Sequence, residues 1–214
     1  MSDERLRELE RRWQETGADE DEAAYLLARL RAGELDVERL KLAAYCDYAA
    51  AQLALGDEAP PTPSDLDAWG RGMHVWGKEA CVRAVVALAR VAFPYWRGHP
   101  EDVPAEAFRA AENWIVCPCR EHAAEARQRE FLASFGNSPL HRTQARVLSR
   151  AARAAAYPSR ASARGISVVA ELTQSLPGVS SPIFTIREEL VPWALGMEPP
   201  TRRHASSSRN PSDT

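Results

Sequence analysis

Apolar residues recur every three or four positions along most of this chain, a spacing that places them on one face of a helix. Between Glu4 and Thr16, for example, Leu6, Leu9 and Trp13 share such a face. Alanine, leucine, arginine and glutamate dominate, and alternating β-branched residues are rare. The pattern therefore predicts an all-α protein.

Helix start and stop signals divide this pattern into segments. The acidic run from Asp19 suits a helix N-terminus, Gly33 ends that helix, and Asp36 is placed to cap the next. Pro104 fits a first helical turn, and Pro118 separates that helix from the following one. Further helices are expected at about 47–56, 76–92, 119–135, 141–156, 161–176 and 184–195, although 166–169 also fits a short strand.

Composition changes along the chain predict its organisation. Residues 1–56 read as acidic helical hairpins, and the segment 57–64 carries three prolines that cannot continue a helix. A main α-helical domain is expected at 65–197, and a disordered tail at 198–214, where proline, serine and arginine replace apolar residues. We expect the helical hairpins to stack side by side, which buries their apolar faces; a solenoid is one arrangement of this kind.

Hydropathy and cysteine content favour an intracellular setting. No apolar run approaches the roughly 20 residues needed to cross a bilayer, and the N-terminus lacks a basic and then apolar leader. The four cysteines are too few for a disulfide scaffold. We therefore expect a cytoplasmic location and no membrane partner.

Charge is distributed unevenly. The net charge is −3, but residues 1–60 carry 15 acidic and 8 basic side chains, whereas 138–170 contain six arginines and no acid. Four of these arginines fall within roughly 80° of one another on a helical wheel. They are Arg142, Arg146, Arg150 and Arg153. The favoured interpretation of this stripe is a solvated face or pairing with the acidic N-terminal helices. An acidic protein partner comes second and nucleic acid third, and for either of them these arginines are the candidate binding surface.

The sequence Cys-Pro-Cys-Arg-Glu-His, residues 117–122, is the main cluster of metal-ligating residue types. The spacing of Cys117, Cys119 and His122 departs from common zinc motifs, and a fourth ligand is missing. Small buried thiols packed at a helix junction are the favoured interpretation. A nucleophilic cysteine, from this cluster or from Cys81 with His74, is a further alternative.

The chain also lacks a phosphate-binding glycine loop, a dinucleotide fingerprint and a paired His-Glu metalloprotease motif. These absences argue against the enzyme classes that depend on such motifs. We accordingly expect a protein without catalytic activity and without a cofactor.

Two local resemblances extend this prediction. Residues 33–56 resemble the opening hairpins of myxobacterial proteins that precede helical-repeat regions. The Ala-Cys helix within 79–93, the acidic Pro-Glu-Asp turn at 100–102 and the Ala-Ala-x-x-Trp helix at 105–114 are similar in order to immunity proteins of bacterial polymorphic toxin systems. The second resemblance implies a non-catalytic helical protein that binds and blocks a cognate toxin, and its pattern does not include the arginine stripe.

The sequence therefore predicts a non-catalytic, cytoplasmic bacterial protein-interaction module, either immunity-type or a regulatory adaptor. A nucleic-acid-associated regulator that uses the Arg142–Arg153 stripe is one alternative. A Cys/His metal or redox protein centred on Cys117, Cys119 and His122 is the other.

Overall fold

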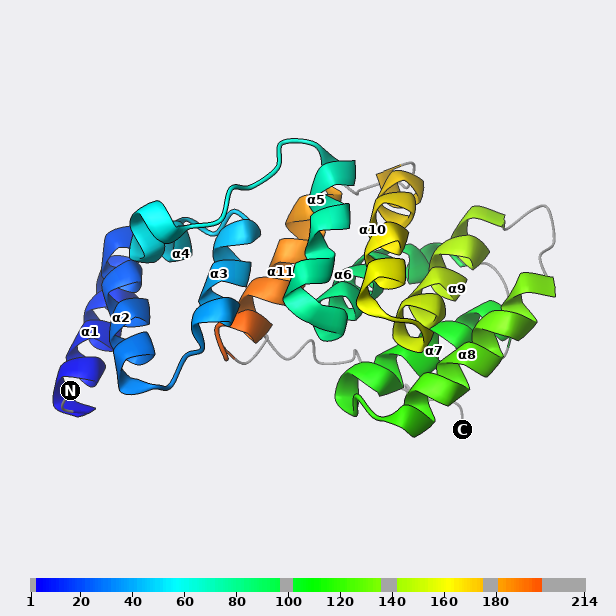
Figure 1. Ribbon diagram of the computed structural model, residues 1–214, viewed down its shortest axis with the longest axis horizontal. Coiled ribbons are helices and arrows are strands. Elements are labelled where there is room, and N and C mark those ends of the chain that lie inside the picture. Colours follow the sequence, from blue (N-terminus) through cyan, green and yellow to red (C-terminus); the bar gives the residue numbers. More distant parts are fainter. Residues whose placement is uncertain (1–2, 97–101, 136–141, 175–180, 198–214) are drawn as a thin grey trace, which may run out of the picture.

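The fold was established from a computed structural model that describes residues 3–96, 102–135, 142–174 and 181–197. All regular elements in these ranges are helical, which confirms the predicted all-α class. The α-helices are α1 (Asp3–Thr16), α2 (Asp19–Ala32), α3 (Val37–Tyr45), α4 (Ala49–Leu55), α5 (Leu66–Gly72), α6 (Gly77–Ala92), α7 (Val103–Val116), α8 (Arg120–Phe135), α9 (Arg142–Ala156), α10 (Ser159–Gln174) and α11 (Pro182–Ala194) (Figure 1). Short 3-10 turns are η1 (Gly56–Glu58), η2 (Met73–Trp76) and η3 (Phe93–Tyr95). The predicted tail, 198–214, lies outside the described residues.

Local sequence signals determine several helix ends. The Asp36 carboxylate caps α3 by accepting hydrogen bonds from the backbone N–H groups of Glu38 and Arg39, at 2.8 and 3.2 Å. Asp65 caps α5 in the same way, and Gly33 ends α2 in the left-handed region, at φ 76°. Residues 166–169 lie inside α10, so the strand alternative for them is wrong. These ends follow from short-range chemistry, which is why the sequence predicted most of them.

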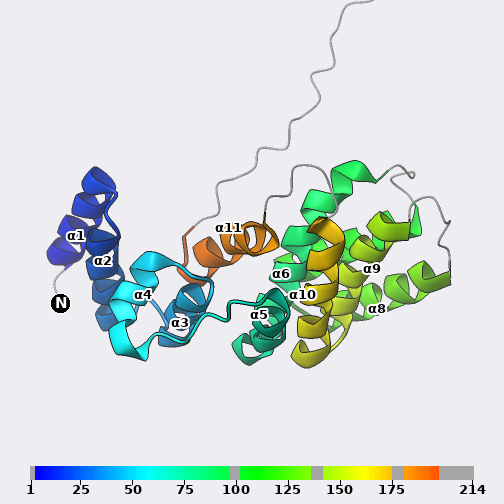
Figure 2. The same cartoon turned by 90° about the horizontal axis from the view of Figure 1, so that it is seen from above.

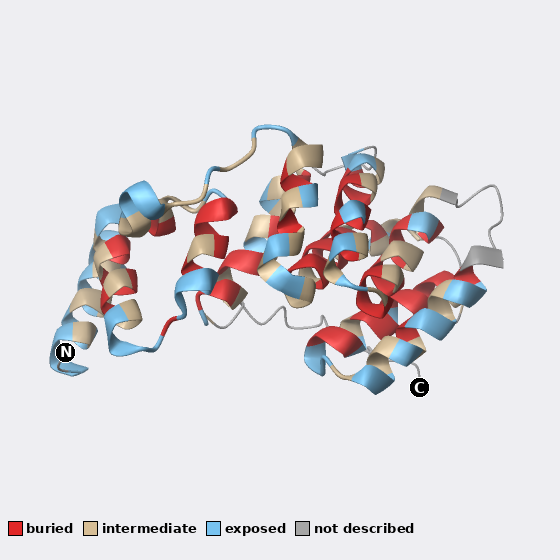
Figure 3. Cartoon of the chain, viewed as in Figure 1, coloured by how far each residue is buried: buried red, intermediate tan, exposed pale blue. Residues whose placement is uncertain are grey.

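The helices lie side by side along the long axis of the molecule (Figure 1). Helices α1 and α2 form one end and α7, α8 and α9 the other, and the view from above keeps this order (Figure 2). The core runs through the middle, where α6 packs against α9, α10 and α11 and ten of its 16 residues are buried (Figure 3). Among the described helices, none is both long and apolar enough to cross a membrane. A solenoid-like regularity stays a prediction.

The proline segment 57–64 is bridged by contacts between the helices on either side of it. The Tyr45 hydroxyl donates to the Trp69 carbonyl at 2.8 Å, and the Trp69 indole N–H donates to the Tyr45 carbonyl at 3.1 Å. The two rings stack with centroids 5.9 Å apart. This reciprocal, buried pair joins α3 to α5 across the predicted linker.

Helix α11 forms a second bridge, because it packs between α3 and α6 (Figure 1). The Trp193 ring receives the guanidinium of Arg39 at 5.0 Å and that of Arg83 at 4.8 Å. Arg29 of α2 donates to the Leu195 carbonyl just beyond α11, at 2.7 Å. The last described helix therefore contacts both N-terminal and central helices, and the division at 57–64 stays a prediction.

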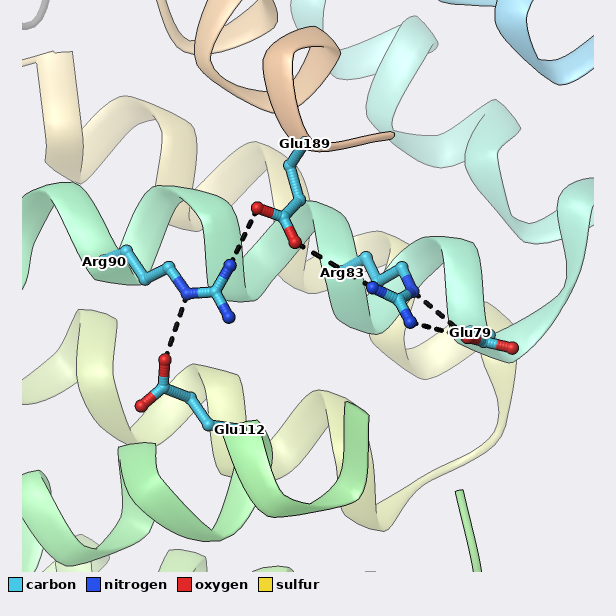
Figure 4. Close-up of polar contacts among 5 residues, drawn as sticks. All are labelled: Glu79, Arg83, Arg90, Glu112 and Glu189. Atoms are coloured by element: carbon cyan, nitrogen blue, oxygen red, sulfur yellow. Dashed lines mark hydrogen bonds and ion pairs between the residues drawn. The ribbon is translucent and has the colours of Figure 1, made fainter. Parts of the chain in front are cut away.

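A chain of ion pairs fixes α11 to α6 and α7 (Figure 4). Arg90 of α6 contacts Glu112 of α7 at 3.0 Å and Glu189 of α11 at 2.7 Å. Glu189 also lies 3.9 Å from Arg83, which pairs with Glu79 at 3.0 Å. Burial would lower the pKa of Arg90, but Glu189 and Glu112 outweigh it and raise the pKa. The network explains how the partly buried Arg90 is held in its charged form.

Candidate functional site

Helix α9 presents two chemically different faces. One face is buried against α6, α7, α8 and α10. Its buried residues are Ala145, Val147, Leu148, Ala151, Ala152, Ala154, Ala155 and Ala156. Arg146 on the opposite face is exposed, and Arg150 and Arg153 are half-buried. Small alanine side chains let the neighbouring helices approach closely, so the arginines project from a rigid, well-packed support.

Arg153 has a partner within the chain. Its guanidinium lies 3.0 Å from the Glu130 carboxylate of α8 and 5.0 Å from the Tyr157 ring centroid. The Glu130 side chain is only 15% exposed, so this pair is better shielded than a typical surface salt bridge. Arg127 lies over the same tyrosine ring, at 5.6 Å. The stripe is therefore anchored at one end by α8.

Unlike Arg153, Arg146 and Arg150 form no ion pair within the described residues. Burial lowers the pKa of Arg150, and the positive charges of Arg153 and Arg146 lower it further, while Glu130 acts in the opposite direction. In the described part of the chain, Glu130 is the carboxylate that pairs with this stripe. Arg142 is the first residue of α9, and its side chain is not among those that the structure describes. We call Arg146, Arg150 and Arg153 the arginine face; it carries an excess of positive charge.

The interpretation in which the acidic N-terminal helices pair with this stripe is wrong for the described residues. Helices α1 and α2 lie at the opposite end of the molecule from α9 in both views (Figures 1 and 2). Asp21 of α2 pairs instead with Arg12 of α1, at 2.8 Å. Sequence-wide charge balance does not reveal which helices are neighbours, whereas the fold does.

Cys117, Cys119 and His122 are brought together at the corner between α7 and α8. Their ligating atoms all lie within 4.8 Å of one another. The Cys119 Sγ atom lies 3.3 Å from His122 Nδ1, which also lies 3.0 Å from the Cys117 carbonyl oxygen. The interpretation of these thiols as buried packing groups is wrong, because Cys117 is exposed and Cys119 is partly exposed.

The corner also shifts the acidities of its three groups. A backbone hydrogen bond from His122 lowers the pKa of Cys119, and contact with Cys119 raises the pKa of Cys117. The hydrogen bond to the Cys117 carbonyl raises the pKa of His122. The cluster therefore combines one thiol of increased acidity, a second thiol and an imidazole.

The alternative pair, Cys81 with His74, is not supported by the geometry. Cys81 is buried and donates from Sγ to the Met73 carbonyl at 3.4 Å, and burial raises its pKa to about 12. His74 Nδ1 faces the Arg71 carbonyl at 2.7 Å instead. A buried thiol of this kind has little nucleophilic thiolate at neutral pH.

Comparisons of the chain with protein-family models, with curated proteins and with solved structures give no match. The arginine face and the Cys–His corner must therefore be interpreted from their own chemistry.

Proposed function

We propose that this protein is a non-catalytic, cytoplasmic protein-interaction module of a bacterium, immunity-type or a regulatory adaptor, that binds an acidic protein through the arginine face. Among the described residues neither Arg146 nor Arg150 forms an ion pair, and this unpaired positive charge on a well-packed helix carries the proposal. A partner carboxylate placed between them would relieve their mutual repulsion.

Three further observations support a protein partner. Arg153 is already held by Glu130 and Tyr157, so its side chain loses less conformational entropy when a partner binds. Arginine is well suited to bidentate pairing with carboxylates. The overall charge of −3 disfavours general attraction to nucleic acid, which makes nucleic acid the weaker candidate.

The charge-reversal variant Arg146→Glu/Arg150→Glu tests the proposal. This double variant leaves the Arg153–Glu130 pair intact. The matched control is Arg5→Glu/Arg7→Glu, which makes the same charge change on exposed positions of α1, at the other end of the molecule. Circular dichroism of both variants checks that helix content is unchanged.

The measurement is capture of partners from lysate of the source bacterium, followed by reconstitution of the complex from purified components. We expect wild type and control to bind one protein with equal affinity and the α9 variant to lose it. Equal binding by all three proteins would overturn the assignment to the arginine face. Recovery of nucleic acid alone, released by nuclease, would overturn the protein-partner proposal in favour of the nucleic-acid regulator.

A further inference from the structure

The Cys–His corner is built by local backbone geometry. Helix α7 ends at Val116, and the Cys117 N–H closes its last turn by donating to the Asn113 carbonyl at 3.0 Å. Pro118 prevents the helix from continuing. The Cys119 N–H then donates to the Cys117 carbonyl at 2.7 Å, and α8 begins at the next residue. This tight turn places both thiols beside His122 in the first turn of α8.

The spacing of the three donors fits a tetrahedral ion. With zinc–sulfur bonds of about 2.3 Å and zinc–nitrogen bonds of about 2.0–2.1 Å, tetrahedral angles require sulfur–nitrogen distances of about 3.6 Å and a sulfur–sulfur distance of about 3.8 Å. The Cys119 Sγ to His122 Nδ1 distance is 3.3 Å, and all three donors lie within 4.8 Å. Closing this geometry takes side-chain rotations in which His122 Nδ1 releases its 3.0 Å contact with the Cys117 carbonyl oxygen and loses its proton to bind the ion.

The donor set also selects the ion. Two thiolates and an imidazole favour zinc and related thiophilic ions over magnesium and calcium, which prefer oxygen ligands. Exposure of Cys117 lets an ion enter from solvent without any opening of the core. The described cluster contains three donors, which leaves a fourth position for water or for a donor from another molecule.

From this geometry we propose that Cys117, Cys119 and His122 form a zinc-binding site with three protein ligands and one open position. The bound ion fastens the end of α7 to the start of α8. This inference is independent of the proposed function, because His122, the ligand on α8, lies about 12 Å along that helix from Glu130, at 1.5 Å per residue. Loss of the ion would leave the arginine face and its Glu130 anchor in place.

Titration of the reduced full chain with cobalt(II) tests the site. Cobalt replaces zinc in such sites and gives visible bands for tetrahedral coordination and a near-ultraviolet band for thiolate ligands. We expect these bands to saturate at one equivalent and to disappear when zinc is added. The Cys119→Ser and His122→Asn variants lose the tetrahedral spectrum, whereas the His74→Asn control, with a histidine outside the corner, keeps it.

Three results would overturn the proposal. The first is the absence of a thiolate band in reduced wild-type protein. The second is a spectrum that persists in the Cys117→Ser/Cys119→Ser double variant, and the third is a spectrum lost equally in His74→Asn. If Cys119→Ser fails to fold by circular dichroism, Cys117→Ser takes its place, because Cys117 is exposed at the corner. A Cys117–Cys119 disulfide in a chain that binds no cobalt after reduction would instead indicate a redox pair.

Discussion

Two buried thiols make the stability of this protein sensitive to alkali. Burial raises the pKa of Cys46 and of Cys81 to about 12, from 9.0 for an unhindered thiol. Between pH 9 and 12 the unfolded chain has therefore lost protons that the folded chain retains, so the free energy of unfolding falls as pH rises. In the middle of this window, where the unfolded thiol is deprotonated and the folded thiol still protonated, each thiol contributes a slope on the order of 1.4 kcal/mol per pH unit.

Chemical denaturation of the reduced protein from pH 8 to 11 measures this slope. We expect Cys46→Ala and Cys81→Ala each to flatten it, and the double variant to flatten it most. Parallel pH profiles for wild type and the double variant would show that the alkaline loss of stability has another origin.

The Tyr45 hydroxyl provides a second test at the scale of single residues. It donates to the Trp69 carbonyl at 2.8 Å in a buried setting. Tyr45→Phe keeps the ring stack but removes the donor, so we expect the free energy of unfolding to fall by about 1–2 kcal/mol. Tyr157→Phe is the control, because among the described contacts Tyr157 engages through its ring. Equal effects of the two substitutions would contradict the role assigned to the hydrogen bond.

At the scale of elements, the sequence predicted which segments are helical more reliably than it predicted which helices pack against one another. Asp36, Gly33 and Pro118 act on backbone within a turn of themselves, so their roles were visible in the sequence. The partner of Arg153 was not, because Glu130 approaches it through the packing of α8 on α9. The exposure of Cys117 was also missed from the sequence. Whether the turn between α7 and α8 is buried depends on the packing of distant segments, which the local sequence pattern does not contain.

Helix α1 lies on the surface, and an aromatic contact joins it to α2 beside the Arg12–Asp21 ion pair. No described residue of α1 is buried (Figure 3). Trp13 stacks on Tyr25 of α2 with centroids 5.5 Å apart. We expect Trp13→Ala to release α1 while the other helices stay folded, because local opening needs little energy where few apolar contacts are broken.

Hydrogen exchange followed by mass spectrometry distinguishes this local effect. Amides of α1 should lose their protection in Trp13→Ala, and amides of α6 should keep theirs. Arg7→Ala, an exposed substitution on the same helix, is the control. Unchanged protection of α1, or loss of protection throughout the chain, would each contradict a specific role for Trp13.

On the scale of the whole molecule, α11 couples the N-terminal helices to the central ones. Trp193 lies between Arg39 of α3 and Arg83 of α6, and each contact is worth about 0.5–1 kcal/mol beyond the area that the ring buries. The sequence predicted α11 but not this position, because its partners are distant in the chain. If α11 maintains the cooperativity of unfolding, removing the Trp193 ring should weaken the coupling between the N-terminal and the central helices more than it lowers the stability of either group.

We therefore expect wild type to unfold in one transition, and Trp193→Ala to make the N-terminal helices α1–α4 unfold at lower denaturant than the central helices. Hydrogen exchange at rising denaturant reports the two regions separately in one sample. Phe184→Ala, which removes an exposed ring from the same helix, controls for the loss of an aromatic residue from α11. If the two regions of Trp193→Ala still unfold together, α11 is not the coupling element, and the Tyr45–Trp69 pair must transmit the cooperativity across residues 57–64 on its own.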